Sequence, residues 1–256
     1  MRDQKISVVI NTYNAEKFLR QCLDAVRSFD EIVVCDMEST DTTLDIAKEY
    51  GCTIVTFPKG NCVSAEPART FAIQSASCPW VLVIDADEIV TPELRQYLYD
   101  HISHADAEEA LWIPRKNYFM GRFMHAFYPD YLLRFFIKEG TVWPPEVHTF
   151  PVVKGRQKKL PRSRKDLAFV HLANDTVYDC VRKINQYTQN EVEKKATKRY
   201  GVGALLWRPA FRFFKAYVLK KGFLDGKAGL VNALIQGVYQ IVAVGKIIEK
   251  HSQQQQ

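Results

Sequence analysis

The stretch WVLVIDADE, residues 80–88, constrains the fold more than any other part of this sequence. Five apolar or aromatic residues run without a break into three carboxylates, Asp85, Asp87 and Glu88. The apolar run is too short for a helix and rich in β-branched residues, which is typical of a strand covered on both faces of a parallel sheet. Open α/β sheets bind their ligands at the carboxyl ends of such strands. The sequence therefore predicts a buried strand that ends in a functional site.

The three carboxylates allow two interpretations. Like charges this close repel one another unless a cation or solvent offsets them, and hard divalent ions such as Mg2+ or Mn2+ take oxygen ligands. A metal site at Asp85 and Asp87 is the functional interpretation. The alternative is a solvated acidic turn that leads into a helix beginning at Thr91, Pro92 and Glu93.

The segment before this stretch alternates strand and helix patterns. Apolar runs that end in polar residues predict strands, and apolar residues at helical spacing predict helices. The predicted strands cover residues 6–14, 32–35 and 52–57, and the predicted helices cover residues 15–29, 42–51 and 67–77. This alternation predicts an α/β fold with a Rossmann-like, doubly wound and mostly parallel sheet.

The turn after the first predicted strand argues against two familiar enzyme classes. It reads NTYNAEK and lacks the glycine-rich fingerprint that lets a pyrophosphate approach the backbone. A dinucleotide-dependent dehydrogenase is therefore disfavoured, and so is a sugar nucleotidyltransferase, which should carry a glycine-rich phosphate loop. A metal on the aspartates is the remaining way to hold phosphates.

Charge is unevenly distributed along the chain. Residues 1–150 carry 14 Lys and Arg against 22 Asp and Glu, whereas residues 151–256 carry 21 against 7. The first part suits a cation-dependent site, and the second suits contact with anions. No zinc-ligand spacing, aromatic RNA-binding signature or helix-turn-helix pattern accompanies the basic part, so we expect no nucleic-acid partner.

Cysteine usage and the N-terminus bear on the compartment. The six cysteines are scattered without paired spacing, which fits a reducing cytosol better than a disulfide framework. The opening MRDQKISVVI leads directly into a strand, so we expect no secretory signal and a cytoplasmic location.

Five motifs in this order resemble the inverting family 2 glycosyltransferases, and among them the bacterial branch that acts on lipopolysaccharide core or capsule precursors. The motifs are TYNAEKFL, DMESTDTT, IDADE, YPDYLLRFF and KAYVLKKGFLDGKAGL. The resemblance implies a GT-A type fold with a nucleotide-sugar-binding catalytic domain over residues 1–150. It also implies an acceptor-side, membrane-associating, basic and helical extension over residues 151–256, continuous with that domain.

The resemblance further implies transfer of a hexose from a nucleoside diphosphate sugar, with a UDP-sugar favoured. The implied acceptor is a lipopolysaccharide-core or lipid-linked glycan. Thr12 and Tyr13 would border the nucleotide base, Asp36 would accept a hydrogen bond from it, and Arg69 would lie near the base or the diphosphate. Glu38 stands where the family usually has glycine, which leaves the donor open more than the reaction class.

The family also implies a metal, Mg2+ or Mn2+, at the aspartates. Asp85 would meet the ribose or the metal, and Asp87 would ligate the metal that bridges the diphosphate. A divalent cation stabilises the negative charge that develops on a departing nucleoside diphosphate. His148 is a further candidate ligand. His171 is either another ligand or a core histidine, and we favour the core interpretation.

An inverting transfer needs a base to take the proton of the acceptor hydroxyl. Asp130 is the first choice, with the alternative that it is a turn residue that orients Arg134 through an ion pair. Glu146 is the second choice, with an exposed carboxylate after a Pro-Pro bend as its alternative. His148 is the third candidate, and Thr149 stands where the family usually has glutamate.

Two basic segments suggest an anionic membrane surface. Residues 154–165 hold seven cations in twelve positions, which is either a solvated loop or a contact with lipid headgroups or a phosphorylated acceptor. Residues 208–223 place arginine and lysine beside aromatic and aliphatic residues at helical spacing, a pattern typical of an interfacial helix.

Residues 228–245 contain no charge and are long enough to raise the question of a membrane span. Asn232, Gln236 and Gln240 form a polar stripe at i, i+4 and i+8, however, which is unfavourable to show to lipid. We therefore expect a helix packed on the protein or lying in the interface, and peripheral association with the inner membrane face. A non-catalytic, GT-A-like scaffold on the membrane is the rival to an enzyme.

Overall fold

A computed structural model describes residues 4–62, 64–146, 149–194 and 199–253. The chain forms two compact units, each assembled from two stretches of sequence. Unit 1 comprises Met1–Lys116 and Pro129–Leu172, and unit 2 comprises Asn117–Tyr128 and Ala173–Gln256. The predicted division into a catalytic domain of residues 1–150 and an extension of residues 151–256 stays a prediction.

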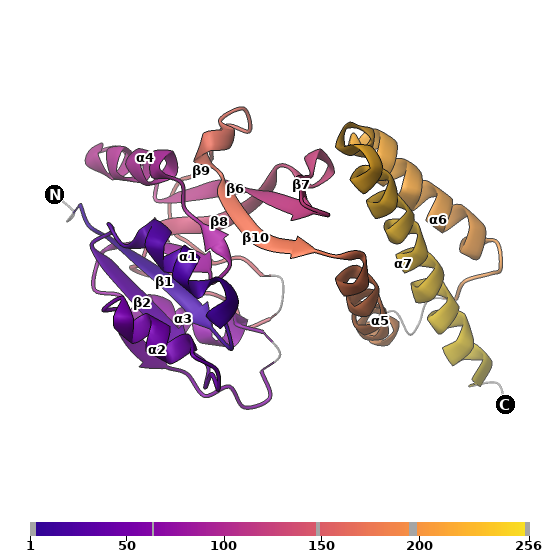
Figure 1. The fold of residues 1–256 in the computed structure, drawn as a ribbon, viewed down its shortest axis with the longest axis horizontal. Coiled ribbons are helices and arrows are strands. Elements are labelled where there is room, and N and C mark those ends of the chain that lie inside the picture. The colour runs from indigo at the N-terminus through magenta and orange to yellow at the C-terminus, as the bar shows by residue number, and fades with distance from the viewer. Residues whose placement is uncertain (1–3, 63, 147–148, 195–198, 254–256) are drawn as a thin grey trace. The chain divides into compact units, whose positions relative to one another are not determined.

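Unit 1 is built on a mixed sheet (Figure 1). Its strands in chain order are β1 (Ile6–Thr12), β2 (Glu31–Asp36), β3 (Thr53–Thr56), β4 (Trp80–Asp85), β5 (Glu88–Ile89), β6 (Ala110–Phe119), β8 (Asp130–Ile137), β9 (Gln157–Lys159) and β10 (Phe169–Asp175), of which β6 and β10 continue into unit 2. The strand order is β3-β2-β1-β4-β8-β6-β10-β5, and β9 pairs with β6. Strands β1 to β4 pair in parallel, whereas β8 runs antiparallel to both β4 and β6. The predicted α/β fold class is confirmed.

Helices cover both faces of the parallel part, which is why the central residues of its strands are apolar. These helices are α1 (Glu16–Val26), α2 (Thr43–Glu49), α3 (Glu66–Gln74) and α4 (Pro92–Ser103), with the short η2 (Lys165–Leu167) near β10 in sequence. Val8 and Ile10 of β1 lie in one core cluster with residues of α1, α2 and α4. Val9 between them points to the other face, where it shares a cluster with α3.

The register of the parallel strands brings three polar strand ends to one edge. Thr12 at the end of β1 lies opposite Asp36 at the end of β2, and Asn11 lies opposite Asp85 at the end of β4. The chain moves from β1 to β2 and β3 on one side and returns to the other side of β1 with β4. Such a switch point is where open α/β sheets bind ligands.

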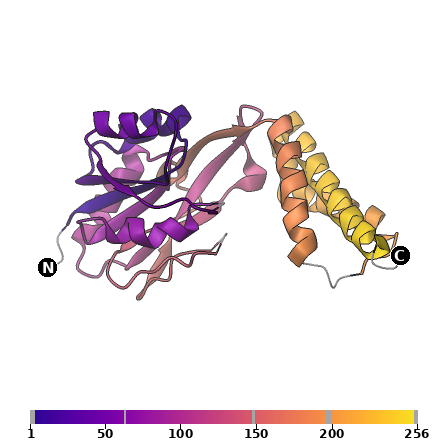
Figure 2. The ribbon, with the colours of Figure 1, turned by 90° about the horizontal axis from the view of Figure 1, so that it is seen from below.

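Unit 2 contains the outer end of β6, which forms a hairpin with β7 (Arg122–Phe123), and a set of helices. The helical segments are η1 (His125–Phe127), α5 (Val177–Lys194), α6 (Ala204–Phe214), η3 (Lys215–Leu219), η4 (Gly222–Asp225) and α7 (Gly226–Gln253). Helix α7 packs against α5 and α6, and the three lie side by side in both views (Figure 2). The predicted helical C-terminal extension is therefore present.

A buried carboxylate fixes the start of α7 to η1. Asp225 is 1% exposed and accepts hydrogen bonds from the backbone N–H groups of His125 and Ala126, at 2.8 and 3.1 Å. The Nδ1 atom of His125 lies 2.7 Å from the same carboxylate. These contacts satisfy backbone donors that would otherwise be buried without partners.

Among the described residues, one helical segment, Gly222–Gln253, has the length and composition of a membrane span. Of its most apolar window, 39% is buried inside the structure. A core helix of a soluble protein passes the same test, so length and composition alone do not assign a span here.

Candidate active site

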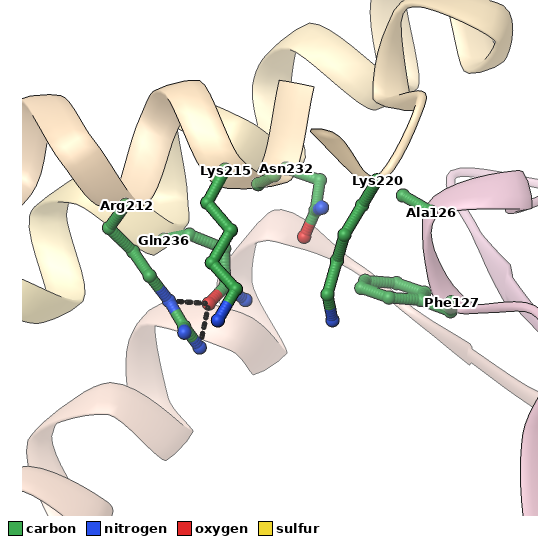
Figure 3. A pocket seen from close by; sticks show the side chains of 8 residues that line it. Ala126, Phe127, Arg212, Lys215, Lys220, Asn232 and Gln236 are labelled. Carbon is green, nitrogen blue, oxygen red and sulfur yellow. Dashed lines mark hydrogen bonds between the residues drawn. The ribbon is translucent and has the colours of Figure 1, made fainter. Parts of the chain in front are cut away.

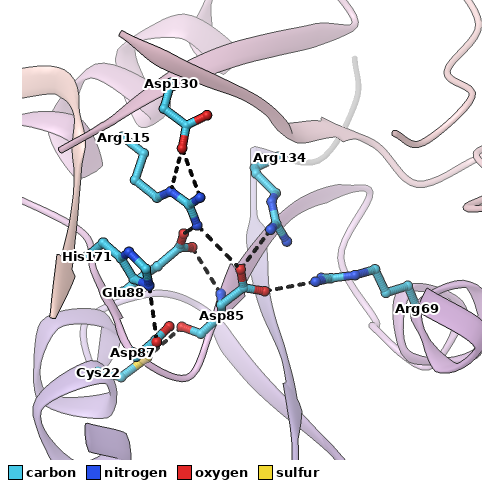
Figure 4. A network of polar contacts seen from close by, with 9 residues as sticks. All are labelled: Cys22, Arg69, Asp85, Asp87, Glu88, Arg115, Asp130, Arg134 and His171. Carbon is cyan, nitrogen blue, oxygen red and sulfur yellow. Dashed lines mark hydrogen bonds and ion pairs between the residues drawn. The ribbon is translucent and has the colours of Figure 1, made fainter. Parts of the chain in front are cut away.

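Asp85 is held by arginines at the carboxyl edge of β4 (Figure 4). Arg69 of α3 donates from Nη2 to its Oδ1 atom, and Arg134 of β8 donates from Nη2 to its Oδ2 atom, both at 2.8 Å. Burial by itself raises the pKa of Asp85, but the positive charges of Arg134 and Arg69 more than offset it and hold that pKa well below its usual range. Asp85 is therefore a fixed negative charge that orients two arginines.

A second ion-pair system lies next to Asp85. Strand pairing places Arg115 of β6 opposite Asp130 of β8, and Nε and Nη2 of Arg115 donate to Oδ2 of Asp130 at 3.1 and 2.8 Å. Nη1 of Arg115 donates at 3.0 Å to Glu88, which is fully buried. Burial favours the neutral form of arginine, but Glu88 and Asp130 raise the pKa of Arg115 above its ordinary value. Arg115 thus links the first-choice base to Glu88 at the start of β5.

Asp87 belongs to a different pair. Its Oδ2 atom lies 3.1 Å from Nε2 of His171 on β10, and the two side chains are 31% and 22% exposed. The antiparallel pairing of β10 with β5 puts His171 opposite Glu88 and so brings it beside the acidic motif. The favoured interpretation of His171 as a core histidine is wrong, because its ring is partly exposed and faces a carboxylate.

The residues predicted to bind the nucleotide base also meet at the carboxyl edge. Asp36 is 1% exposed and accepts from Thr12 Oγ1 at 2.8 Å, from the Ser39 hydroxyl at 2.6 Å and from the Ser39 backbone N–H at 2.8 Å. Tyr13 is 46% exposed, and Lys59 Nζ lies 4.6 Å from the centre of its ring. The ordered loop at Asp36 and the accessible ring of Tyr13 together form one border of the edge.

The other predicted residues lie outside the network drawn in Figure 4. Glu146 is exposed, and only its backbone oxygen has a described contact, a hydrogen bond from the hydroxyl of Thr149 at 2.8 Å. His148 lies outside the described residues. The roles assigned to both, like the roles of Asp130 and Asp85, stay predictions.

Several buried polar atoms at this edge have no hydrogen-bond partner in the described part of the chain. They include Nε and Nη1 of Arg69, Nη1 of Arg134, the indole N–H of Trp143 and the amide of Asn11. The Trp143 ring packs against both arginines, with guanidinium carbons 4.5 and 5.3 Å from its centre. Buried donors without partners cost free energy, so this cluster is a candidate place for a ligand that carries oxygen acceptors.

Comparison with known proteins identifies the kind of enzyme that carries this edge. The sequence profile of glycosyl transferase family 2 matches residues 7–155, which is more than half of the chain. The chain belongs to glycosyl transferase family 2. The matched region contains β1 from its second residue, β2 to β4 and α1 to α4, together with Asp85, Asp87 and Asp130, whereas His171 lies beyond it.

Curated relatives match over nearly the whole length. The chain is 25% identical over 264 residues to an uncharacterized glycosyltransferase of Rickettsia typhi, covering 96% of this chain and 87% of the relative. It is also 25% identical over 259 residues to the lipopolysaccharide core biosynthesis glycosyltransferase LpsC of Rhizobium meliloti, covering 96% and 93%. As a family 2 member with such relatives, the protein is a glycosyltransferase.

A solved structure confirms the fold. The mannosyltransferase PcManGT from Pyrobaculum calidifontis, in complex with GDP-Man and Mn2+, superposes with a TM-score of 0.55 at 16% identity, covering 97% of this chain and 89% of that one. Identity this low shows only a shared GT-A fold. The family 2 resemblance seen in the sequence motifs is confirmed.

The side-chain contacts of Asp85, Asp87 and Glu88 distinguish a solvated turn from a structured polar centre. The helix that follows begins with its own cap, because Thr91 Oγ1 accepts from the backbone N–H of Leu94 at 3.1 Å. The carboxylates of Asp85, Asp87 and Glu88 instead contact arginine and histidine side chains. The motif is therefore a structured polar centre and not a solvated turn.

Proposed function

We propose that this family 2 enzyme is a metal-dependent, inverting glycosyltransferase that moves a hexose from a nucleoside diphosphate sugar, with UDP-sugars favoured, to a lipopolysaccharide-core or lipid-linked glycan. One observation carries the proposal. The Asp87–His171 pair lies on the same carboxyl edge as two arginines that keep buried N–H groups without a partner among the described residues. A metal-binding pair beside anion-accepting donors suits a diphosphate.

The donor set of Asp87 and His171 fits a divalent cation. Mg2+ is commonly held by one or two protein ligands, with its remaining positions filled by substrate phosphates and water. Among the described residues, no group of three His, Cys, Asp or Glu side chains could hold an ion alone, so the diphosphate would complete the shell. When bound, Mg2+ or Mn2+ supplies positive charge to the leaving group. We therefore assign Asp87 and His171 as its holders.

Arg69 and Arg134 are assigned to the diphosphate. Each arginine donates one hydrogen bond to Asp85 and has a further buried nitrogen that does not donate to Asp85. Asp85 balances their charge and fixes their orientation, so the donors are preorganised where negative charge increases during transfer. Thr12, Tyr13 and Asp36 are assigned to the nucleoside, because they form the border of the same edge.

Asp130 is assigned as the base. The acceptor oxygen attacks the anomeric carbon, the bond from that carbon to the diphosphate oxygen breaks, and the hydroxyl proton passes to the Asp130 carboxylate. Arg115 orients that carboxylate through two hydrogen bonds and connects it to Glu88. Glu146 is the second candidate, and its exposure would require it to approach the acceptor from solvent.

The proposed acceptor and location follow from the relatives and from unit 2. LpsC is named for lipopolysaccharide core biosynthesis, which supports a glycan built on lipid at the cytoplasmic face of the inner membrane. Unit 2 exposes many large apolar side chains, which supports peripheral contact with that membrane. The basic stretch at residues 154–165 is a weaker candidate, since Lys158 and Arg164 already pair with Glu108 and Asp166.

Calorimetry with UDP, with and without Mn2+, tests the donor site. We expect metal-dependent binding by the wild type that is lost in Asp87→Ala and weakened in His171→Ala. Asp45→Ala removes an exposed carboxylate of unit 1 and is the matched control. Undiminished binding by Asp87→Ala would overturn the metal assignment. Absence of metal-dependent binding with UDP, GDP, CMP and ADP alike would contradict the donor proposal and favour the inactive scaffold.

A further inference from the structure

Unit 2 contains a basic pocket that the donor site does not use (Figure 3). The cavity has a volume of about 210 Å3 and lies between η1, the α6–η3 segment and α7. Three cations line it, namely Arg212, Lys215 and Lys220, together with the amides of Asn232 and Gln236 and the ring of Phe127. No carboxylate is among the lining residues. The pocket therefore concentrates positive charge in a hollow with room for a phosphate group.

Two of the cations, Arg212 and Lys215, keep their charge available to a ligand. Arg212 donates from Nε and Nη2 to Oε1 of Gln236, at 3.3 and 3.1 Å, so its fixed partner is a neutral amide. Within the described part of the chain, neither Arg212 nor Lys215 forms an ion pair with a carboxylate. The polar stripe noted in the sequence thus positions a guanidinium without neutralising it.

A largely buried amide also lines the pocket. Asn232 is 5% exposed, and among the described residues its side chain has no hydrogen-bond partner. Its amide is directed into the space between Lys215 and Lys220 (Figure 3). The Asn232 amide lines the cavity, so its N–H group can donate to a ligand with oxygen acceptors.

The surroundings of the pocket select a lipid over a soluble anion. The segment that supplies two of its lysines also exposes large apolar side chains between 42% and 60% accessible, namely Phe214, Val218, Leu219, Phe223 and Leu224. A lysine on an apolar surface can pack its alkyl chain against that surface and place its ammonium group at the level of the lipid headgroups.

We propose that this basic pocket binds the terminal phosphate, a phosphomonoester, of an anionic lipid headgroup while the flanking apolar side chains enter the membrane interface. Lys215, Lys220 and Arg212 would pair with the phosphate oxygens, and the Asn232 amide would donate to one of them. The inference rests on the proposed membrane association and is independent of the donor site in unit 1.

Vesicle co-sedimentation of the full chain tests the pocket. The vesicles contain phosphatidylcholine with either phosphatidic acid or phosphatidylserine, matched for surface charge. Lys227→Gln removes an exposed charge of unit 2 outside the pocket and should lower binding about fivefold on both. Lys215→Gln should lower binding about 10- to 100-fold on phosphatidic acid and only about fivefold on phosphatidylserine. Equal losses from the two variants would overturn the pocket.

Asn232→Leu provides a second readout without changing charge. If the amide is kept for a ligand, leucine should preserve or raise the melting temperature while weakening binding to phosphatidic acid. A lowered melting temperature with unchanged lipid binding would mean that Asn232 is structural, and it would overturn its assignment to the pocket.

Two further arms separate the alternatives. Leu224→Ser leaves the lining intact and should weaken vesicle binding. Unchanged vesicle binding by Leu224→Ser, together with Lys215-dependent binding of inorganic phosphate, would identify a soluble phosphate and overturn the lipid assignment. No vesicle binding by the wild type would overturn this inference and the membrane association together. Calorimetry with UDP and Mn2+ should be unaffected by Lys215→Gln, so failure here is distinguishable from failure of the donor site.

Discussion

Arg115→Met should destabilise the fold in a strongly pH-dependent way. Arg115 is the partner of Glu88, a carboxyl with no exposed surface, and its own side chain is 19% exposed. Removing one member of a buried ion pair leaves an uncompensated charge and typically costs about 3–5 kcal/mol. Because Arg115 keeps some solvent contact, we expect the lower end, about 3 kcal/mol near pH 8.

The sign of the pH dependence follows from Glu88. Burial, and then the charge of Asp85, raise the pKa of Glu88 above its ordinary value, while Arg134 and Arg115 oppose that rise. Without Arg115 this pKa should rise further. A carboxyl whose pKa is raised on folding stabilises the native state below its unfolded pKa of about 4.3, and that contribution is lost as the pH climbs through the folded pKa. The variant should therefore be closest to the wild type near pH 5 and fall away toward pH 8.

Urea denaturation at pH 5 to 8 measures the effect as the difference in free energy of unfolding between variant and wild type. Arg20→Met, which removes an exposed partner of Glu49, is the control and should show no such pH dependence. Arg115→Met combined with Glu88→Gln should recover most of the loss at pH 8, because position 88 then carries no unpaired buried charge. A loss of equal size at pH 5 and pH 8, or no recovery in the double variant, would refute this account of how the site is held.

Three further predictions concern chemistry and packing. Asp130→Asn should lower transfer about 10²- to 10⁴-fold while donor binding by calorimetry is kept, whereas Glu146→Gln should stay near wild type; the reverse result would move the base to Glu146. Glu38 has a φ of +63°, a conformation that glycine adopts freely and that strains a β-branched residue. Glu38→Gly should therefore fold normally, whereas Glu38→Val should lower the free energy of unfolding by about 1–2 kcal/mol in urea denaturation. Equal stabilities of the two variants would contradict this backbone strain. Gly229→Ala should lower the free energy of unfolding by about 1–3 kcal/mol, because a Cβ there would lie 1.9 Å from the Gly222 carbonyl oxygen. Gly245→Ala is the control, since open space surrounds that position, and it should be neutral or stabilising in the same assay.

Local sequence patterns predicted the first part of the fold well. The apolar run at 80–84 became β4, and the helical spacing at 15–29 became α1, because burial on both faces of a parallel sheet leaves a clear hydrophobic period. Glu38 shows the same consistency, since it takes the left-handed backbone conformation that suits the glycine usual at that position. The ends of the elements differ from the predictions by a few residues.

The side-chain partners at the site were beyond the reach of local patterns. Arg115 meets Asp130 only because β6 and β8 pair in a particular register, and His171 meets Asp87 across 84 positions of sequence. A single histidine in the strand-like LAFVHLAN has the same local signature whether it is core or site. The nearest signal was the presence of a polar ring in an otherwise apolar strand, which is ambiguous without the pairing partner.

The number of cations in a segment did not predict where they gather in the structure. The cations of residues 154–165 suggested a lipid contact, yet several pair with acidic side chains of unit 1, such as Lys158 with Glu108. Three cations of unit 2 converge on one pocket instead, where Arg212 faces an amide and not a carboxylate. Convergence of this kind depends on helix packing and is invisible to composition.

A crystal grown with UDP and Mn2+ and measured at the manganese absorption edge tests the central claim most directly. The account predicts an anomalous peak within about 2.5 Å of both an Asp87 carboxylate oxygen and Nε2 of His171, with the diphosphate against Arg69 and Arg134. A manganese peak that contacts neither Asp87 nor His171, or a diphosphate bound away from the two arginines, would contradict it.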